Sequence, residues 1–399
     1  MRIGIDARLL TYRRGMGNYV YSLLNGVSAI PSRHEFFLFL SAADAHNPET
    51  LPTMPPAWRL IGLPGRNYAI EEQVALPALV LRNRIDLLHC PANTFPLFLP
   101  PRVALVVTIH DVMYLMPQKQ MGGRFSVYQR LGRAYRRLVV RRLRRRTASL
   151  LTVSNRSAQD VAAYLGVPRA TITVTHEAAP PQFRRIDGQS DGLNAIRARR
   201  NLDGDFILAL GGIDPRKNTD AVLMAYLEFR RRSNLRHKLA VVGLPAGATA
   251  RFARIAERAG LAQDVEFPGF VSDDELVSLY NAASMFVYPS RYEGFGLPVL
   301  EAMSCGTPVI ASTAGAVPEV AGDAAILVDP DDMRALSDAI IGLASDTSAR
   351  RVLSAKGLRR ASEFSWARCA RETIDAYERT HPYEYSVRDR APTVSADTR

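Results

Sequence analysis

Short runs of aliphatic residues alternate along the chain with longer stretches of helical periodicity. The runs are strand-sized and rich in Val, Ile and Leu, which is typical of buried parallel strands. In the first half the pattern predicts strands at Arg2–Ile5, Phe36–Leu40, Asp86–Cys90, Val103–Ile109, Leu150–Val153 and Ile172–Val174. The helices predicted between them include Asn18–Ala29 and Ser157–Tyr164.

The alternation stops in a polar stretch at about 180–191, which we interpret as a linker, and then starts again. The strands predicted beyond it are Phe206–Leu210, Lys238–Val242, Val265–Phe267, Met285–Tyr288, Pro308–Ile310 and Ala325–Val328. The helices predicted there include Thr219–Arg230, Thr249–Ala259, Asp273–Asn281 and Pro298–Ser304.

Strands separated by helices form parallel sheets that are covered on both faces. We therefore predict an α/β fold of two doubly wound, Rossmann-like domains, with ligands bound beyond the carboxyl ends of the strands. A chain of 399 residues is long enough for two domains. The predicted boundaries are 1–185 for the N-terminal domain, 186–365 for the C-terminal domain, 366–381 for a helix that crosses back to the N-terminal domain, and 382–399 for a disordered tail.

Composition narrows the class of protein. The hydrophobic content of 47% is normal for a globular protein, and no apolar stretch approaches the roughly 18 residues of a membrane-spanning helix. The opening residues MRIGIDARLL contain no signal-peptide core, so we expect a cytoplasmic protein. The three cysteines are far apart in sequence, and we expect reduced thiols.

The formal net charge of +12 is concentrated in one segment. Residues 124–146 contain ten arginines and no acidic residue, which favours a phosphate-bearing partner. As a helix, this segment would place an apolar face against the N-terminal domain and an arginine face outward. The apolar face comprises Tyr128, Leu131, Tyr135, Leu138 and Val139, and the arginine face Arg130, Arg133, Arg137, Arg141 and Arg144. The arginines either contact an anionic membrane surface or are simply solvated.

The richest motif is the segment at 288–312, YPSRYEGFGLPVLEAMSCGTPVIAS. A glycine-containing loop leads from a strand into a helix with proline in its first turn, so that backbone amides at the helix start can bind an anion. Glu293 and Glu301 stand at the two ends of this unit and can accept hydrogen bonds from sugar hydroxyls.

Three further motifs follow strands, where ligands gather in this architecture. The segment GGIDPRKN at 211–218 brings Arg216 and Lys217, two cations that can neutralise a diphosphate leaving group. The segment TIHD ends with His110 and Asp111. The loop RRGMGNY at 13–19 is glycine-rich and precedes a helix, as phosphate-facing loops do.

Together these motifs resemble the retaining GT-B glycosyltransferases of family 4, from about residue 3 to 378. The resemblance implies that Glu293 binds the transferred sugar, Glu301 the nucleotide ribose, and the amides of Gly294, Phe295 and Gly296 the donor diphosphate. It also implies that Lys217 binds phosphate, that His110 lies by the donor sugar, and that Gly15 and Gly17 contact donor or acceptor. The nucleotide base is expected against Gly269, Phe270 and Val271.

One position departs from the family pattern. Many relatives carry a second phosphate-binding arginine where this chain has Gly212, and we expect Arg216 to take over that role.

The resemblance implies a retaining, metal-independent hexosyltransferase that needs no cofactor and binds no nucleic acid. The DAR…GMGNY opening, together with DPRKN, is similar to mannosyltransferases of O-antigen and exopolysaccharide assembly, so the first expectation is GDP-mannose and a saccharide or lipid-linked acceptor. A lipid-linked acceptor would place the enzyme at the inner face of the cytoplasmic membrane. UDP-glucose, UDP-N-acetylglucosamine and deoxysugar donors stay open, as do a GT-B nucleotide-sugar epimerase and a non-catalytic basic binding protein.

Overall fold

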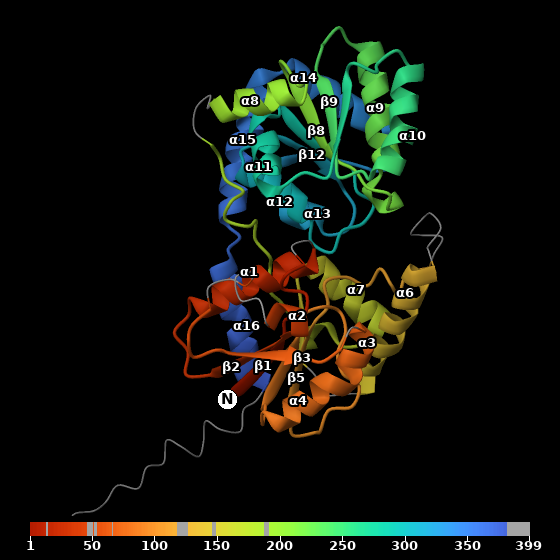
Figure 1. The fold of residues 1–399 in the computed structure, drawn as a ribbon. Coiled ribbons are helices and arrows are strands. Elements are labelled where there is room, and N and C mark those ends of the chain that lie inside the picture. The colour runs from red at the N-terminus through yellow and green to blue at the C-terminus, as the bar shows by residue number, and fades with distance from the viewer. Residues whose placement is uncertain are drawn as a thin grey trace, which may run out of the picture.

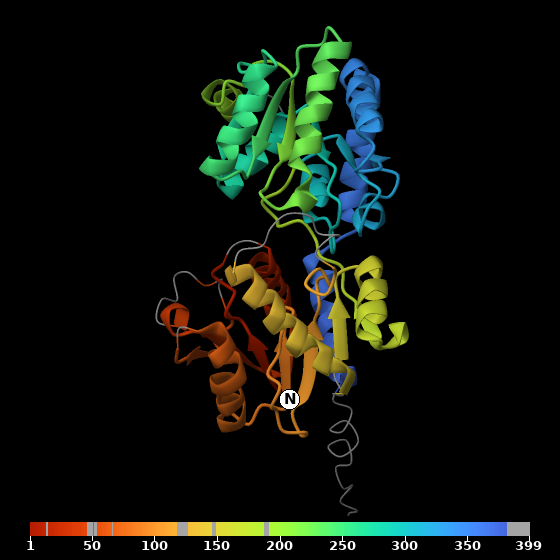
Figure 2. The same ribbon diagram turned by 90° about the vertical axis from the view of Figure 1, so that its right-hand side faces the viewer.

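Two parallel sheets, one in each half of the chain, form the framework of the protein (Figure 1). The structure is a computed structural model that describes residues 1–12, 15–45, 51, 54–65, 67–117, 127–145, 149–186 and 191–380. Helices cover the sheets, and the two halves stack end to end in both views (Figures 1 and 2). The predicted α/β class with two Rossmann-like halves is confirmed.

The N-terminal sheet has seven strands in the order β3-β2-β1-β4-β5-β6-β7. The order reverses between β1 and β4, which marks the crevice where such sheets bind ligands. The strands are β1 Arg2–Asp6, β2 Glu35–Ser41, β3 Arg59–Leu63, β4 Leu87–Cys90, β5 Ala104–Thr108, β6 Ser149–Thr152 and β7 Ile172–Val174. The helical segments are α1 Met16–Ser28, α2 Ala42–Ala45, α3 Tyr68–Ile70, the π-helical η2 Glu71–Ala75, α4 Leu76–Arg82, α6 Val127–Val140, η3 Arg141–Arg145, α7 Asn155–Leu165 and η4 Arg169–Thr171.

The C-terminal sheet has six strands in the order β10-β9-β8-β11-β12-β13. They are β8 Phe206–Leu210, β9 Lys238–Val242, β10 Val265–Gly269, β11 Met285–Tyr288, β12 Val309–Ser312 and β13 Ala325–Val328. The helical segments are α8 Asp191–Arg199, η5 Pro215–Lys217, α9 Thr219–Arg232, α10 Ala246–Arg258, α11 Asp273–Ala282, α12 Leu297–Ser304, α13 Val317–Ala321, α14 Met333–Ser345, α15 Thr347–Ser362 and α16 Trp366–Thr380.

Strand β2 shows why these runs form a two-sided core. Phe37 and Phe39 pack into one buried cluster, and Phe36, Leu38 and Leu40 pack into another. Side chains alternate between the two faces of a strand, so a continuous apolar run fills both faces of the sheet. Helices on both sides then keep water from the strands.

The last helix returns from the C-terminal half to the N-terminal sheet. Helix α16 packs against α1, where a Cβ on Gly26 would come within 2.8 Å of the Trp366 carbonyl oxygen. The Tyr377 hydroxyl lies 2.7 Å from Nδ1 of the fully buried His89. Residues beyond 380, including the predicted tail at 382–399, lie outside the described part of the chain.

A carboxylate of the C-terminal half caps a helix of the N-terminal half. Glu319 accepts hydrogen bonds from the backbone amides of Asn155 and Arg156 at 2.8 and 3.0 Å, and its Oε1 lies 2.8 Å from His176 Nε2. Burial alone would raise the pKa of Glu319, but these donors outweigh it and lower the pKa to about 2. The two halves are thus joined by a charged cap at the positive end of α7.

The orientation predicted for the arginine-rich helix is wrong. Leu131 and Leu138, expected in the core, are 66% and 56% exposed, whereas Val139 is buried as expected. The helix is turned because Arg133 and Arg137, expected in solvent, are half-buried and donate hydrogen bonds to carbonyl groups of the preceding loop. The side chains of Tyr128 and Arg144 lie outside the described part.

Several elements escaped the sequence pattern. The edge strand β3 and the helices α8, α14 and α15 were not predicted. In α8 and α15 the apolar residues are few or evenly spread around the helix. None of the described helices combines the length and apolar character that crossing a bilayer requires.

Replacement of Gly17 tests whether this glycine serves packing rather than ligand contact. We expect Gly17→Ala to lower the free energy of unfolding by about 3 kcal/mol or more, because its Cβ would lie 1.6 Å from the Tyr12 carbonyl oxygen. Thermal unfolding measures the loss. The control Gly342→Ala adds its Cβ to open space in a helix and should stabilise the protein by up to about 1 kcal/mol. Equal midpoints for Gly17→Ala and wild type would contradict the packing role.

Candidate functional site

Loops after two neighbouring strands of the C-terminal sheet bring together an ion pair. Strands β8 and β11 are adjacent, so the segments that follow them emerge side by side at the carboxyl edge of the sheet. Lys217 Nζ, after β8, lies 3.0 Å from Oε1 of Glu293, after β11, and also donates to the Tyr288 hydroxyl. Two residues predicted from separate motifs therefore meet in one site.

The Glu293 carboxylate is held in its charged form. Its Oε1 accepts hydrogen bonds from the Tyr288 hydroxyl at 2.7 Å and from Ser290 Oγ at 2.8 Å, in addition to Lys217. Burial would raise the pKa of Glu293, but Lys217, these hydroxyls and nearby Arg216 lower it below its usual value. A buried carboxylate with such partners is a fixed negative charge that can accept hydrogen bonds from a ligand.

Arg216 is less available than Lys217. Its Nε and Nη2 donate to the carboxylate of Asp214, with Nε 3.0 Å from Oδ1, and Nη1 lies 3.5 Å from the Tyr292 carbonyl oxygen. At Gly212 a Cβ would lie 3.1 Å from Lys217 Cγ, so the glycine leaves room for the lysine chain. This chain thus has Gly212 where many relatives have a phosphate-binding arginine, and Arg216, which was expected to replace that arginine, is already paired with Asp214.

The glycine loop at the start of α12 touches the N-terminal half directly. A Cβ on Gly294 would lie 2.4 Å from the His110 carbonyl oxygen, and the Gly294 carbonyl accepts hydrogen bonds from Ser154 Oγ and Ser157 Oγ at 2.6 and 2.8 Å. Phe295 is buried among residues of both halves, so only its backbone can face a ligand. Gly296 begins the helix at φ +109°, a conformation that favours glycine.

Three polar contacts hold His110 in place. Its backbone amide donates to Asn93 Oδ1 at 2.7 Å, its Nε2 lies 2.8 Å from the Pro91 carbonyl oxygen, and its Nδ1 lies 3.3 Å from Glu177 Oε1. The ring also meets the Tyr19 ring edge-on, with centroids 4.5 Å apart. Burial alone would lower the pKa of His110, but Glu177 and the Pro91 carbonyl raise it. Both ring nitrogens thus face acceptors, which favours the protonated imidazolium.

The second carboxylate, Glu301, is in the opposite electrostatic state. It is buried in α12, and its Oε2 lies 3.5 Å from the Tyr280 hydroxyl. Burial, with a further contribution from Asp273, raises the pKa of Glu301 to about 8. At neutral pH this side chain is therefore mostly protonated and can both donate and accept hydrogen bonds.

Matches to known proteins cover both halves of the chain. The family model Glycosyltransferase Family 4 matches residues 13–182, and Glycosyl transferases group 1 matches residues 194–360. The chain belongs to the group 1 glycosyltransferases of family 4. O-antigen chain mannosyltransferase B of Escherichia coli is 35% identical over 229 residues, which are 57% of this chain and 60% of that relative's length. The chain thus spans less than two thirds of that relative.

Solved structures share the GT-B arrangement of two sheets. Sucrose-phosphate synthase (tll1590) from Thermosynechococcus elongatus superposes with a TM-score of 0.73 at 20% identity, over 95% of this chain and 98% of that one. Anabaena Alr3699/HepE, solved in complex with UDP and glucose, gives a TM-score of 0.69 at 17% identity, over 94% of this chain and 99% of that one. At these identities the likeness concerns the fold.

The remaining residues predicted from the family lie at the end of β10 and at the start of α1. Gly269 ends β10 at φ +74°, and Phe270 after it is 57% exposed. Gly15 precedes α1 at φ +51°, while Gly17 packs against backbone. The roles of these residues in donor binding stay predictions. Within the described ranges, no group of three or more His, Cys, Asp or Glu side chains has the arrangement of a metal site.

Sequence reasoning missed two residues that hold His110. Glu177 belongs to the segment that connects the two sheets, and Asn93 lies in the loop after β4. Neither stands in a recognisable motif, and their distances from His110 in sequence differ, so only the folded chain brings them together. Asp111, the residue after His110, accepts a hydrogen bond from the Met113 amide at 2.9 Å, within its own loop.

The raised pKa of Glu301 predicts that the free energy of unfolding falls as pH rises. Between pH 5 and pH 8 the folded state retains a proton that the unfolded state releases, so this group lowers the free energy of unfolding as pH rises. We expect Glu301→Gln to be more stable relative to wild type at pH 8 than at pH 5. Thermal unfolding of both proteins at each pH measures the difference, and an equal difference at both values would contradict the raised pKa.

Proposed function

We propose that the protein is a glycosyltransferase that moves a hexose from a nucleotide-sugar donor to a saccharide or lipid-linked acceptor in cell-surface polysaccharide synthesis. The observation that carries this proposal is the contact of Lys217 with Glu293 at the start of α12, between the two sheets. The Lys217 cation and the amide groups at the start of α12 can bind a diphosphate, and the Glu293 carboxylate can accept hydrogen bonds from a sugar. Membership in family 4 supports the same reaction class.

In the proposed reaction, Lys217 exchanges Glu293 for the donor diphosphate. Each charged group keeps a partner throughout, because phosphate replaces the carboxylate at the lysine and sugar hydroxyls replace the lysine at the carboxylate. The amides of Gly294, Phe295 and Gly296 would bind the same diphosphate. Arg216 would add positive potential, although Asp214 neutralises most of it.

We further propose that transfer retains the anomeric configuration and that protein cations, rather than a metal ion, stabilise the leaving diphosphate. The departing phosphate oxygen would accept the proton of the acceptor hydroxyl on the face from which it leaves. His110 would orient the donor sugar, for which it must exchange one of its two ring contacts, to Pro91 or to Glu177. Glu301 would bind the ribose hydroxyls, and Gly269, Phe270 and Val271 the base.

Mannose from GDP-mannose is the donor that we propose first. The name of the mannosyltransferase relative supports mannose, and the resemblance of the DAR…GMGNY and DPRKN segments supports the same subgroup. UDP-linked glucose or N-acetylglucosamine is the second candidate, supported by the UDP and glucose named for the Anabaena structure.

Protection against thermal unfolding identifies the donor. We expect GDP-mannose to raise the unfolding midpoint more than UDP-glucose or UDP-N-acetylglucosamine, because a ligand at about 100 times its Kd stabilises the folded state by about 2.7 kcal/mol. Free mannose serves as the control. Protection by UDP-glucose alone would replace the GDP-mannose assignment, and no protection by any nucleotide sugar would count against the donor site itself.

Removal of the proposed phosphate cation tests the mechanism. We expect Lys217→Ala to lower turnover by about 10²–10³, since a group that stabilises developing charge is lost. The control is Lys356→Ala, whose side chain pairs with Asp323 on the surface and should leave turnover unchanged. Because Glu293 loses its cation in the first variant, thermal unfolding is measured in parallel. Turnover near the wild-type value in folded Lys217→Ala would remove Lys217 from the mechanism.

A further inference from the structure

We give the name outer patch to five of the large apolar side chains that are exposed on the N-terminal half. Their exposed fractions are 80% for Phe98, 66% for Leu131, 65% for Val74, 63% for Ile70 and 56% for Leu138. Single exposed apolar residues are common, but a group of them on neighbouring elements marks a contact surface.

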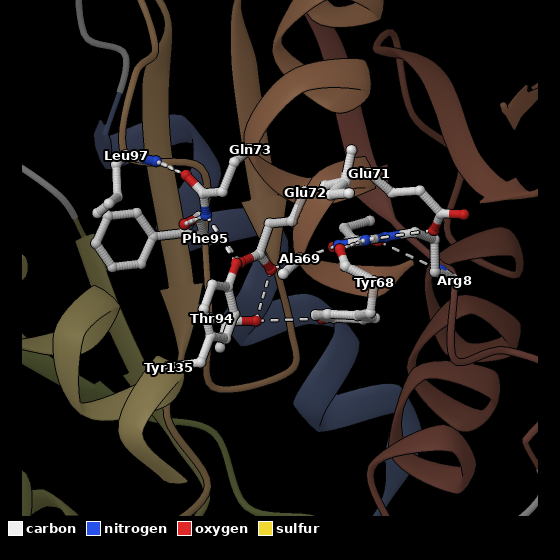
Figure 3. Close-up of polar contacts among 12 residues, drawn as sticks. Arg8, Tyr68, Ala69, Glu71, Glu72, Gln73, Thr94, Phe95, Leu97 and Tyr135 are labelled. Carbon is white, nitrogen blue, oxygen red and sulfur yellow. Dashed lines mark hydrogen bonds and ion pairs between the residues drawn. The ribbon is translucent and has the colours of Figure 1, made fainter. Parts of the chain in front are cut away.

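The outer patch comes from three segments that meet at Gln73. The Gln73 side chain accepts the Leu97 amide at 2.9 Å and donates to the Phe95 carbonyl oxygen at 3.1 Å and to the Tyr135 hydroxyl at 2.9 Å (Figure 3). Val74 adjoins Gln73, and Phe98 adjoins Leu97.

The two leucines flank the same meeting point. Leu131 and Leu138 lie four residues before and three residues after Tyr135 in α6, on the same side of the helix. Because Tyr135 is bonded to Gln73, the exposed leucines stand beside the segment that carries Ile70 and Val74.

A buried polar network holds these segments in place. Oxygen Oε1 of Glu72 accepts Thr94 Oγ1 at 2.6 Å and lies 3.4 Å from Arg8 Nη2, and its Oε2 accepts the Tyr135 hydroxyl (Figure 3). The Arg8 guanidinium also stacks on the Tyr68 ring, 4.0 Å from its centroid. The outer patch is therefore preformed, and no segment has to fold in order to present it.

Exposed arginines accompany the two leucines along the chain. Arg130 directly precedes Leu131 in α6, and Arg141, three residues after Leu138, begins the 3-10 helix η3 that follows α6. Residues 124–146 contain no acidic side chain that would neutralise them. The surface thus combines an apolar centre with a cationic border.

We propose that the outer patch docks on an anionic phospholipid surface. The apolar side chains would enter the boundary between headgroups and acyl chains, and Arg130 and Arg141 would contact lipid phosphates. A second copy of the chain fits less well, because a symmetric contact would set these arginines against their own copies. Docking would bring the candidate site to a lipid-linked acceptor, and only this role rests on the proposed function.

Co-sedimentation with lipid vesicles tests the docking without any substrate. We expect wild type to bind vesicles of equal parts phosphatidylglycerol and phosphatidylcholine more tightly than vesicles of phosphatidylcholine alone. The double variant Leu131→Ser/Leu138→Ser should bind the mixed vesicles at least about tenfold more weakly, because two apolar insertions are lost. Arg130→Glu/Arg141→Glu should lose the preference for phosphatidylglycerol, at about fivefold or more per arginine.

The matched control is Met224→Ser/Val352→Ser, which removes two apolar side chains of similar exposure, 49% and 54%, from the C-terminal half. It should bind vesicles as wild type does. Thermal unfolding verifies that every variant is folded.

Three outcomes would overturn the proposal. They are no wild-type binding to the mixed vesicles, equal binding by the leucine variant, and a lipid-independent dimer that the leucine variant abolishes. Failure of the proposed function is a separate result, since a protein that binds vesicles but is protected by no nucleotide sugar would keep the docking surface and lose the enzyme.

Discussion

The approach of Gly294 to His110 is the contact on which the arrangement of the site depends. A side chain on Gly294 would collide with the His110 carbonyl oxygen, and the Gly294 carbonyl is bonded by Ser154 and Ser157 at the start of α7. The glycine loop before α12 in the C-terminal half therefore contacts the segment after β5 in the N-terminal half. With Glu319 capping α7 from the C-terminal half, backbone groups and a fixed charge join the two halves beside the apolar cluster that buries Phe295 among residues of both.

The partners of the two buried glutamates of α12 and its preceding loop give them opposite charge states. Glu293 lies among a lysine and two hydroxyls, so its pKa falls despite burial. At Glu301, burial and Asp273 outweigh the Tyr280 hydroxyl and Lys217, so its pKa rises. One group is a permanent acceptor and the other can donate a proton in a hydrogen bond. This division suits the proposed contacts, in which a charged carboxylate holds a sugar and a neutral one holds a ribose.

The polar network beneath the outer patch extends to the N-terminal sheet. Arg8 follows β1 at its carboxyl edge, and the same guanidinium reaches Glu72 in the network beneath the outer patch. Strand β1 is also one of the two strands at the topological switch point of this sheet, where folds of this kind bind ligands.

The sequence alone determined the fold class and most of the central site. Alternating strand and helix runs imply parallel sheets whatever the details of packing, and the motifs that contain Lys217 and Glu293 end strands that become neighbours. Local spacing fixes such features because strands and helices have fixed periods. Glu177 and Asn93 could not be found in this way, since each reaches His110 only through tertiary contacts.

Tertiary structure also decided which face of α6 is buried. Helical periodicity placed Leu131 and Leu138 inside, but periodicity cannot weigh an apolar face against the buried carbonyl groups that Arg133 and Arg137 satisfy, or against the Tyr135 bond to Gln73. Leaving buried polar groups unpaired costs free energy comparable to that of exposing leucines, so polar partners can decide which face of a helix is buried. The partners of a side chain, and not its spacing, set its environment there.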